Sequence, residues 1–179
     1  MLDELTLRTL TMRDLLFGTK TPRLNIGPGM ANLEASLPEE DIKIALDRNI
    51  KAIAWLKGPN NLHLVNAMAE YLPFRDNSLP TVTTQSTFQV MKDQEAFLKE
   101  LARVLKRGGF FCITIEGRTW YQPEMQRFIV DDLEPLQTYL QNLALKIIEI
   151  KYLDYNGCWH DTPNKAFSLW ILGVNCNLI

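Results

Sequence analysis

The sequence predicts one α/β domain in which helices cover both faces of a mostly parallel sheet. Segments with strand-like and helix-like apolar patterns alternate along the chain, the order that produces parallel strands joined by right-handed crossovers. Residues 110–115 are almost continuously apolar, as expected of a strand buried on both faces. The turn Asn25-Ile26-Gly27-Pro28-Gly29 follows the first predicted strand and indicates a nucleotide-cofactor site.

The individual elements follow from apolar periodicity and from the residues that interrupt it. Strands are predicted at 23–26, 42–46, 62–65, 81–85, 110–115, 147–155 and 167–175. Helices are predicted at 2–17, 30–37, 50–57, 94–105 and 128–143. The helix at 94–105 has the clearest pattern, because Phe97, Leu101 and Val104 share one face, and Gly108-Gly109 ends it.

The last two predicted strands differ from the others in their connection. Residues 156–166 carry the turn signals Asn156-Gly157 and Thr162-Pro163 but no helical pattern. Parallel strands usually need a longer, helical crossover, so the last strand should run antiparallel to its neighbour. Because no repeat or linker interrupts the chain, we expect residues 1–179 to form a single domain.

Composition and charge narrow the classes of function. The formal net charge is −2 and no basic run is present, which argues against nucleic-acid partners. Charged residues among the leucines of the first 20 positions exclude a signal-peptide core or a membrane span there. Cys112, Cys158 and Cys176 are widely spaced, which argues against a disulfide framework and against a metal site. We therefore expect a cytoplasmic protein without a membrane partner.

Three features in chain order favour a nucleotide-cofactor site. Gly27 and Gly29 would let a ligand approach the backbone closely. Asp47, at the predicted end of the second strand, could accept hydrogen bonds from ribose hydroxyls. Residues 68–70 follow the third strand, where an adenine ring would lie. Two simpler interpretations remain open, namely Gly27 as a plain strand-to-helix turn and Asp47 as the N-cap of the next helix.

Two segments carry a resemblance to a known family. Ala69-Glu70-Tyr71-Leu72-Pro73-Phe74, followed by Asp76-Asn77-Ser78, resembles the AExLPFxDNSF segment of the class I S-adenosylmethionine-dependent methyltransferases of the small-molecule type 11 kind. Residues 95–109 resemble the ExALxExxRVLKPGG segment of the same family, and the spacing between the two segments matches without a gap. The resemblance covers roughly residues 23–116.

The resemblance implies a fold, a cofactor and a set of site residues. It implies a Rossmann-like three-layer sandwich with a seven-stranded sheet whose last strand is antiparallel, S-adenosylmethionine as cofactor, and a small molecule as methyl acceptor. By family position, the residues expected at the cofactor are Asn25, Gly27, Gly29, Asp47, Met68, Ala69, Glu70 and Gln85. Among them, the glycines would pass under the methionine part, Asp47 would hold the ribose, and residues 68–70 would flank the adenine.

Several positions depart from the family pattern. Asn25 stands where the family usually has an acidic residue, Ala31 replaces its third glycine, Met68 its usual Asp, and Pro80 its usual acidic residue. These changes keep open a degenerate methyltransferase fold that binds a cofactor or a partner without transferring methyl. A nicotinamide-dependent oxidoreductase is a third hypothesis, which the match over residues 72–109 argues against.

The acceptor side offers two candidate catalytic residues. His160, beside Asp161, is the best candidate for a general base, and Glu116 follows the fifth strand. An exposed hairpin histidine and a helix-capping glutamate are the alternative interpretations. Because no insertion suggests a lid, we expect either an open site or one that a partner completes, such as the second copy of a homodimer.

Overall fold

The computed structural model describes residues 12–16, 18–56, 60–116, 133–154, 158–161 and 166–176. Within these ranges the strands are β1 (Arg23–Ile26), β2 (Lys43–Asp47), β3 (Leu62–Asn66), β4 (Leu79–Thr84), β5 (Leu105–Glu116), β6 (Leu145–Asp154), β7 (Trp159–His160) and β8 (Ala166–Asn175). The helices are α2 (Asn32–Ser36), α3 (Ile50–Trp55), α4 (Gln94–Val104) and α5 (Glu134–Asn142), with a short 3-10 helix η1 (Phe88–Val90). Residues 12–16 are also helical.

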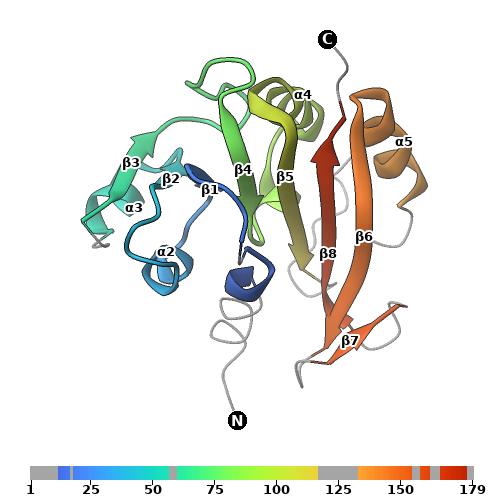
Figure 1. The fold of residues 1–179 in the computed structure, drawn as a ribbon, viewed down its shortest axis with the longest axis horizontal. Helices are drawn as coiled ribbons and strands as arrows, with labels where there is room; N and C mark the ends of the chain where they lie inside the picture. The colour runs from blue at the N-terminus through green and yellow to red at the C-terminus, as the bar shows by residue number, and fades with distance from the viewer. Residues whose placement is uncertain are drawn as a thin grey trace.

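The strands form one sheet in the order β3-β2-β1-β4-β5-β8-β6-β7 (Figure 1). Strands β1 to β5 pair in parallel, whereas β8 lies antiparallel between β5 and β6. The predicted parallel sheet with an antiparallel last strand is therefore confirmed. The described sheet has eight strands instead of seven, because the two residues of β7 pair with Tyr152 and Leu153 at its edge.

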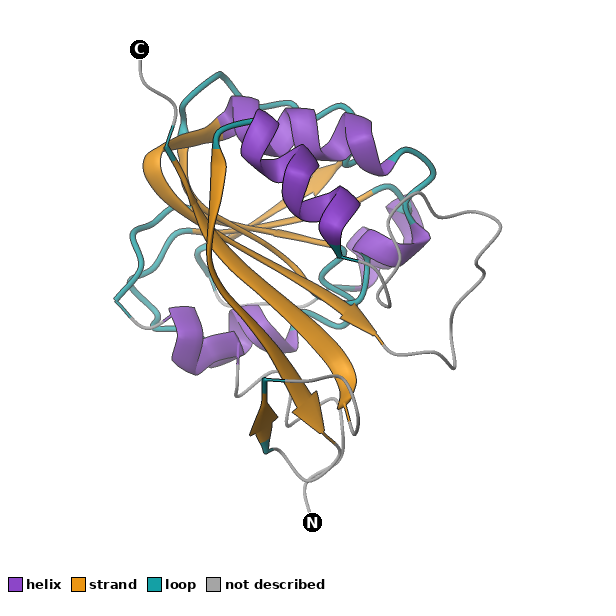
Figure 2. Ribbon diagram, turned by 90° about the vertical axis from the view of Figure 1, so that its right-hand side faces the viewer, coloured by secondary structure: helices purple, strands orange, loops and turns teal. Residues whose placement is uncertain are grey.

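Helices cover both faces of the sheet, which makes three layers (Figure 2). Successive side chains of β5 point to opposite faces. Phe111, Ile113 and Ile115 therefore belong to one buried cluster, whose other members include residues of α4 and α5. Cys112 belongs to a second cluster, together with residues of the 12–16 helix and of α2. A strand buried on both sides explains why residues 110–115 are almost continuously apolar.

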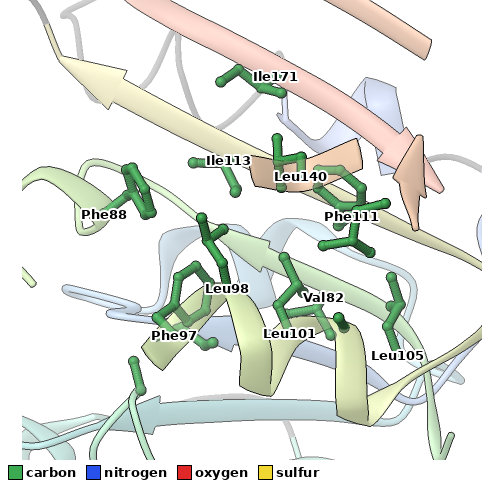
Figure 3. Close-up of a cluster of buried hydrophobic side chains, with 14 of the residues drawn as sticks. Val82, Phe88, Phe97, Leu98, Leu101, Leu105, Phe111, Ile113, Leu140 and Ile171 are labelled. Atoms are coloured by element: carbon green, nitrogen blue, oxygen red, sulfur yellow. The ribbon is translucent and has the colours of Figure 1, made fainter. Parts of the chain in front are cut away.

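Helix α4 packs its apolar face on the sheet (Figure 3). Phe97, Leu98 and Leu101 are each at most 1% exposed and lie in the same cluster as Val82 and Phe111. Burying side chains of this size contributes about 1.5–3 kcal/mol each relative to leaving them exposed. The Asp93 carboxylate begins the helix by accepting a hydrogen bond from the N–H of Ala96.

The junction between α4 and β5 differs from the prediction. The helix ends at Val104 and the strand already begins at Leu105, so Gly108-Gly109 does not form a turn that precedes the strand. The register with β4 shifts between the pairs Leu79↔Leu105 and Thr81↔Phe110. The glycines therefore lie in a bulge, where Gly108 has a φ of 68° that favours glycine.

Two residues of α4 hold the loop between β3 and β4. Arg103 donates from Nη2 to the carbonyl of Leu72 at 2.9 Å and from Nη1 to that of Phe74 at 2.8 Å. The Glu100 carboxylate accepts hydrogen bonds from Arg103 and from the N–H of Leu72. The two segments that carry the family resemblance are therefore bound to each other, which gives their residue pattern a structural role.

Two predicted helices are observed only in part. The helix expected at 128–143 is observed from Glu134, and its residues 128–132 lie outside the described residues. Of the helix expected at 2–17, the part before residue 12 also lies outside them. No helix within the described ranges is long and apolar enough to cross a membrane.

Candidate cofactor site

A cleft of about 520 Å³ lies at the carboxyl ends of β1, β2 and β4. Its walls come from the ends of the strands and the residues that follow them, together with residues of α2 and η1. The lining consists of 26–30 at β1, 46–49 at β2, Ala67, Ala69 and Glu70 after β3, 85–87 after β4, Asn32, Leu33, Val90 and Met91. The chain runs from β1 outward to β2 and β3 and then returns to place β4 on the other side of β1, and such switch points are where open α/β sheets bind ligands. The volume is in the range of small-molecule and cofactor sites.

The turn after β1 depends on its two glycines for different reasons. Gly27 has a φ of 69°, and a Cβ at this position would lie 2.0 Å from Thr87 Oγ1. A side chain here would therefore push the β4 loop away. Gly29 has a φ of 58°, but a Cβ there would meet nothing within 4 Å. At position 29, glycine is therefore required only by the positive φ, and the space beside it is open to a ligand. Gly27 meets a packing need whether or not a ligand binds.

Asp47 lies at the end of β2 and lines the cleft. Its Oδ1 accepts a hydrogen bond from the N–H of Asn49 at 2.8 Å, which leaves its other oxygen for a ligand. The N-cap of α3 is Asn49, whose Oδ1 accepts from the N–H groups of Lys51 and Ala52. The interpretation of Asp47 as the cap of that helix is therefore wrong.

The segment after β3 enters the cleft only in part. Ala69 and Glu70 are buried and line it. Met68 is 39% exposed and does not belong to the lining. Because the carbonyl of Leu72 and the N–H of Leu72 are both held by α4, the position of Glu70 depends on that contact.

The segment after β4 contributes Gln85 and the two residues that follow it. Ser86 and Thr87 also line the cleft. Ser86 has a positive φ of 52°, and its N–H donates to Thr114 Oγ1 at 3.0 Å. Thr87 Oγ1 donates to the carbonyl of Gln85 at 2.9 Å. Three consecutive polar residues after a buried strand were the available sequence signal for this wall.

Asn25 lies behind the glycine turn and is not part of the lining. It is 4% exposed, and its Nδ2 donates to Glu34 Oε1 at 2.8 Å. Glu34 was not among the residues predicted from the sequence. Burial raises the pKa of the Glu34 carboxyl above its ordinary value, against the hydrogen bond from Asn25 and the charge of Lys43, which lower it.

Of the two expected catalytic residues, the structure describes the side chain of His160, which lies outside the cleft lining. His160 Nε2 is 2.9 Å from Asp154 Oδ2, within the β6–β7 hairpin. Glu116 ends β5 opposite Ser168, and its side chain lies outside the described part of the structure. Because β5 and β6 run in the same direction as β4, these residues are at the same edge of the sheet as the cleft. Strand β6 is three strand spacings from β4, roughly 14 Å.

The cleft therefore combines six of the expected cofactor residues. They are Gly27, Gly29, Asp47, Ala69, Glu70 and Gln85. Apolar Leu46, Ala67 and Met91 lie among acidic and amide groups, a mixture that suits an adenosine ring system with a polar tail. Within the described residues, no group of three or more His, Cys, Asp or Glu side chains could hold a metal ion.

Comparison with known proteins identifies the family of this domain. The family described as methyltransferase domain matches residues 24–113, half of the chain. The malonyl-(acyl-carrier protein) O-methyltransferase of Marinomonas sp. is 28% identical over 172 residues, which cover 85% of this chain and 63% of that protein. The fatty-acid O-methyltransferase of Mycolicibacterium smegmatis is 32% identical over 99 residues, or 54% of this chain and 35% of that protein. The chain thus spans less than two thirds of the length of either relative.

A solved structure supports the same fold. The S-adenosylmethionine-dependent methyltransferase of Aquifex aeolicus superposes with a TM-score of 0.67 at 16% identity, covering 98% of this chain and all of that one. At this sequence identity, the similarity is evidence for the fold alone.

Proposed function

Because the chain belongs to the class I S-adenosylmethionine-dependent methyltransferases, we propose that it binds this cofactor in the cleft and transfers the methyl group to a small molecule. The observation that carries the proposal is the meeting of Gly27, Gly29, Asp47 and Glu70 around one cleft at the switch point of the sheet. Bound S-adenosylmethionine would supply a methyl group already activated by its sulfonium. The protein then mainly has to align the cofactor and the acceptor.

Each wall of the cleft has a role in this proposal. Asp47 accepts hydrogen bonds from the ribose hydroxyls, because the N–H of Asn49 occupies only one of its oxygens. Ala69 and Glu70 border the adenine. Gly29, beside open space, allows the methionine part to lie against the backbone. Gln85, Ser86 and Thr87 border the place of methyl transfer.

We propose that the acceptor atom is an oxygen of a small molecule. The two relatives compared above are named as O-methyltransferases, one of a fatty acid and one of a malonyl group on its carrier. Met30 and Val90 line the cleft while being 77% and 53% exposed, so its mouth has an apolar rim. An apolar portion of an acceptor would bury this surface.

His160 and Glu116 are proposed as bases for an acceptor that has to lose a proton. Asp154 would accept the Nε2–H of His160 and leave Nδ1 as the proton acceptor. An acceptor in the cleft must extend across β5, β8 and β6 to reach His160, which belongs to β7. Glu116, at the end of β5, is one strand spacing from β4 and is the nearer of the two.

A non-catalytic binding protein is the alternative. It is favoured by Asn25, Met68 and Pro80, which stand at positions where the family usually has acidic residues. Such a protein would retain a cofactor-shaped cleft without transferring methyl.

Calorimetry with S-adenosylhomocysteine tests the proposal. The unsubstituted protein should bind it, Asp47→Ala should weaken binding by roughly 10- to 100-fold, as expected for one or two lost hydrogen bonds, and the exposed Glu40→Ala should not change it. Absence of binding by the unsubstituted protein at millimolar ligand would overturn the proposal. Methyl transfer from radiolabelled S-adenosylmethionine to a panel of carboxylic acids and phenols then separates the two functions. Cofactor binding without transfer to any member of that panel supports the alternative.

A further inference from the structure

Glu34 is a buried carboxylate just beneath the glycine turn. It lies in α2 and is 1% exposed. Its Oε1 accepts a hydrogen bond from Asn25 Nδ2, and its Oε2 has no hydrogen-bond partner among the described residues. The hydrogen bond from the neutral Asn25 amide and the one from the Glu34 backbone compensate only part of the free energy lost when a carboxylate leaves water. Such a group destabilises the fold, so a role other than stability would explain its presence.

The charged residues around Glu34 do not offset the cost of burying its carboxylate. Lys43 on β2 has an electrostatic influence on it, but its Nζ donates to the carbonyl of Pro38 and to Asn61 Oδ1. Arg23, at the start of β1, forms an ion pair with Asp41. The charged groups that line the cleft are Asp47, Arg48 and Glu70. Within the described residues, Glu34 therefore has no cation in direct contact.

The hydrogen bond from Asn25 determines the direction of its amide. Nδ2 faces Glu34 Oε1, the arrangement that a carboxylate able only to accept requires. The Oδ1 atom then faces β4, where Thr83 Oγ1 donates to it at 3.4 Å. Asn25 is two residues before Gly27 on the central strand of the site. The Glu34–Asn25 pair thus forms the support of the glycine turn.

The topology indicates which end of the cofactor lies above this pair. The sheet runs β3-β2-β1-β4, with Ala69 and Glu70 after β3 and Asp47 after β2. If Asp47 holds the ribose, the adenine extends toward β3 and the amino-acid end extends over β1. That end carries an ammonium group, and a buried negative charge beneath it would act through a medium of low dielectric constant.

We propose that Glu34 is a positioning residue of the cofactor site, whose carboxylate orients the Asn25 amide and supplies the negative charge beneath the ammonium of the bound cofactor. This inference rests on the proposed cofactor binding. It assigns to Glu34, one hydrogen bond further from the turn, the charge that Asn25 lacks. Burial raises the pKa of Glu34, and the positive charge of a bound ammonium would lower it.

The variant Glu34→Gln separates charge from packing. It is nearly isosteric, and its Oε1 can still accept from Asn25, so only the charge is removed. A group that serves the fold alone should leave ligand affinity unchanged. We expect the reverse, namely a higher midpoint of urea unfolding near pH 8, because a buried charge is gone, and roughly tenfold weaker binding of S-adenosylhomocysteine, the size of one charge-assisted contact.

Two controls sharpen the calorimetric test. Methylthioadenosine lacks the amino-acid end, so its dissociation constant should be the same for Glu34→Gln as for the unsubstituted protein. The exchanged pair Asn25→Asp with Glu34→Gln returns one carboxylate to the site and should restore S-adenosylhomocysteine affinity to within about threefold.

The outcomes distinguish the two proposals. If the unsubstituted protein fails to bind S-adenosylhomocysteine, both the proposed function and the role of Glu34 are wrong. If it binds and Glu34→Gln binds equally well, only the role of Glu34 is overturned. An equal loss of affinity for methylthioadenosine would likewise overturn it, because the effect would then not concern the amino-acid end.

Discussion

Arg103 offers the sharpest test of how α4 supports the site. Its guanidinium donates five hydrogen bonds, two to Glu100, two to the carbonyls of Leu72 and Phe74, and one to Asp76. The Asp76 side chain is 71% exposed, so that contact contributes little. The others are partly buried and contribute about 1 kcal/mol each or less. Arg103→Ala should therefore lower the free energy of unfolding by about 2–4 kcal/mol.

Urea unfolding followed by circular dichroism measures this change, with an unaltered slope indicating a comparable unfolded state. Arg107→Ala removes the same charge from an exposed position a few residues further on and should change the stability by less than about 0.5 kcal/mol. Arg103→Ala should also weaken S-adenosylhomocysteine binding, because Glu70 precedes the loop that Arg103 holds. If the two variants unfolded at the same urea concentration, the contact between α4 and the loop would not have the role inferred for it.

Four further predictions concern the glycine turn, α3, Glu100 and the thiols. Gly27→Ala should cost about 2–4 kcal/mol of stability because of the Thr87 clash, and Gly29→Ala only about 1 kcal/mol of backbone strain, both measured by urea unfolding. Asn49→Ala should cost about 1 kcal/mol through loss of the α3 cap, again by urea unfolding. Hydrogen bonding by Arg103 lowers the pKa of Glu100 below its unfolded value of about 4.3, so its contribution is complete above that pH and is lost as the pH falls through the folded pKa. Glu100→Gln should therefore reduce stability more at pH 7 than at pH 3, and equal losses would contradict this. Burial raises the pKa of the Cys112 thiol, so in a disulfide-exchange assay Cys112 should react only after unfolding, whereas the exposed Cys158 and Cys176 react in the native protein.

The sequence predicted the bounds of an element well where proline and glycine residues flank it. Strand β1 has the predicted bounds Arg23–Ile26, because a proline precedes it and Gly27 ends it. Helix α2 is shorter than predicted at its start. Ala31 adopts a φ of 59°, so the helix begins at Asn32 instead of residue 30. Strand β7 was not predicted, because two residues carry no periodicity and their pairing depends on the tertiary position of β6.

For the site, too, the sequence predicted the residues with local signals and missed those that depend on tertiary contacts. Gly27, Gly29, Asp47, Ala69, Glu70 and Gln85 follow strands directly, so a correct strand order was enough to bring them together. Glu34 occupies the first turn of a helix, where an acidic residue has an ordinary explanation in the helix dipole. Only its packing against β1 distinguishes it, and that contact depends on the three-dimensional fold. The separation of His160 from the cleft likewise follows from β8 lying between β5 and β6.

The connections of the sheet also bear on how the protein folds. Around the cleft, β1, β2, β3 and β4 pair only in parallel, so every pairing must await a crossover. Strands β6 and β8 are antiparallel neighbours joined by a short connection, and they close a smaller loop. We therefore expect the β6–β8 half to become protected from hydrogen exchange first during refolding and the cleft half last. Cofactor binding would then stabilise the part of the chain that forms latest, and so act most strongly where local opening is easiest.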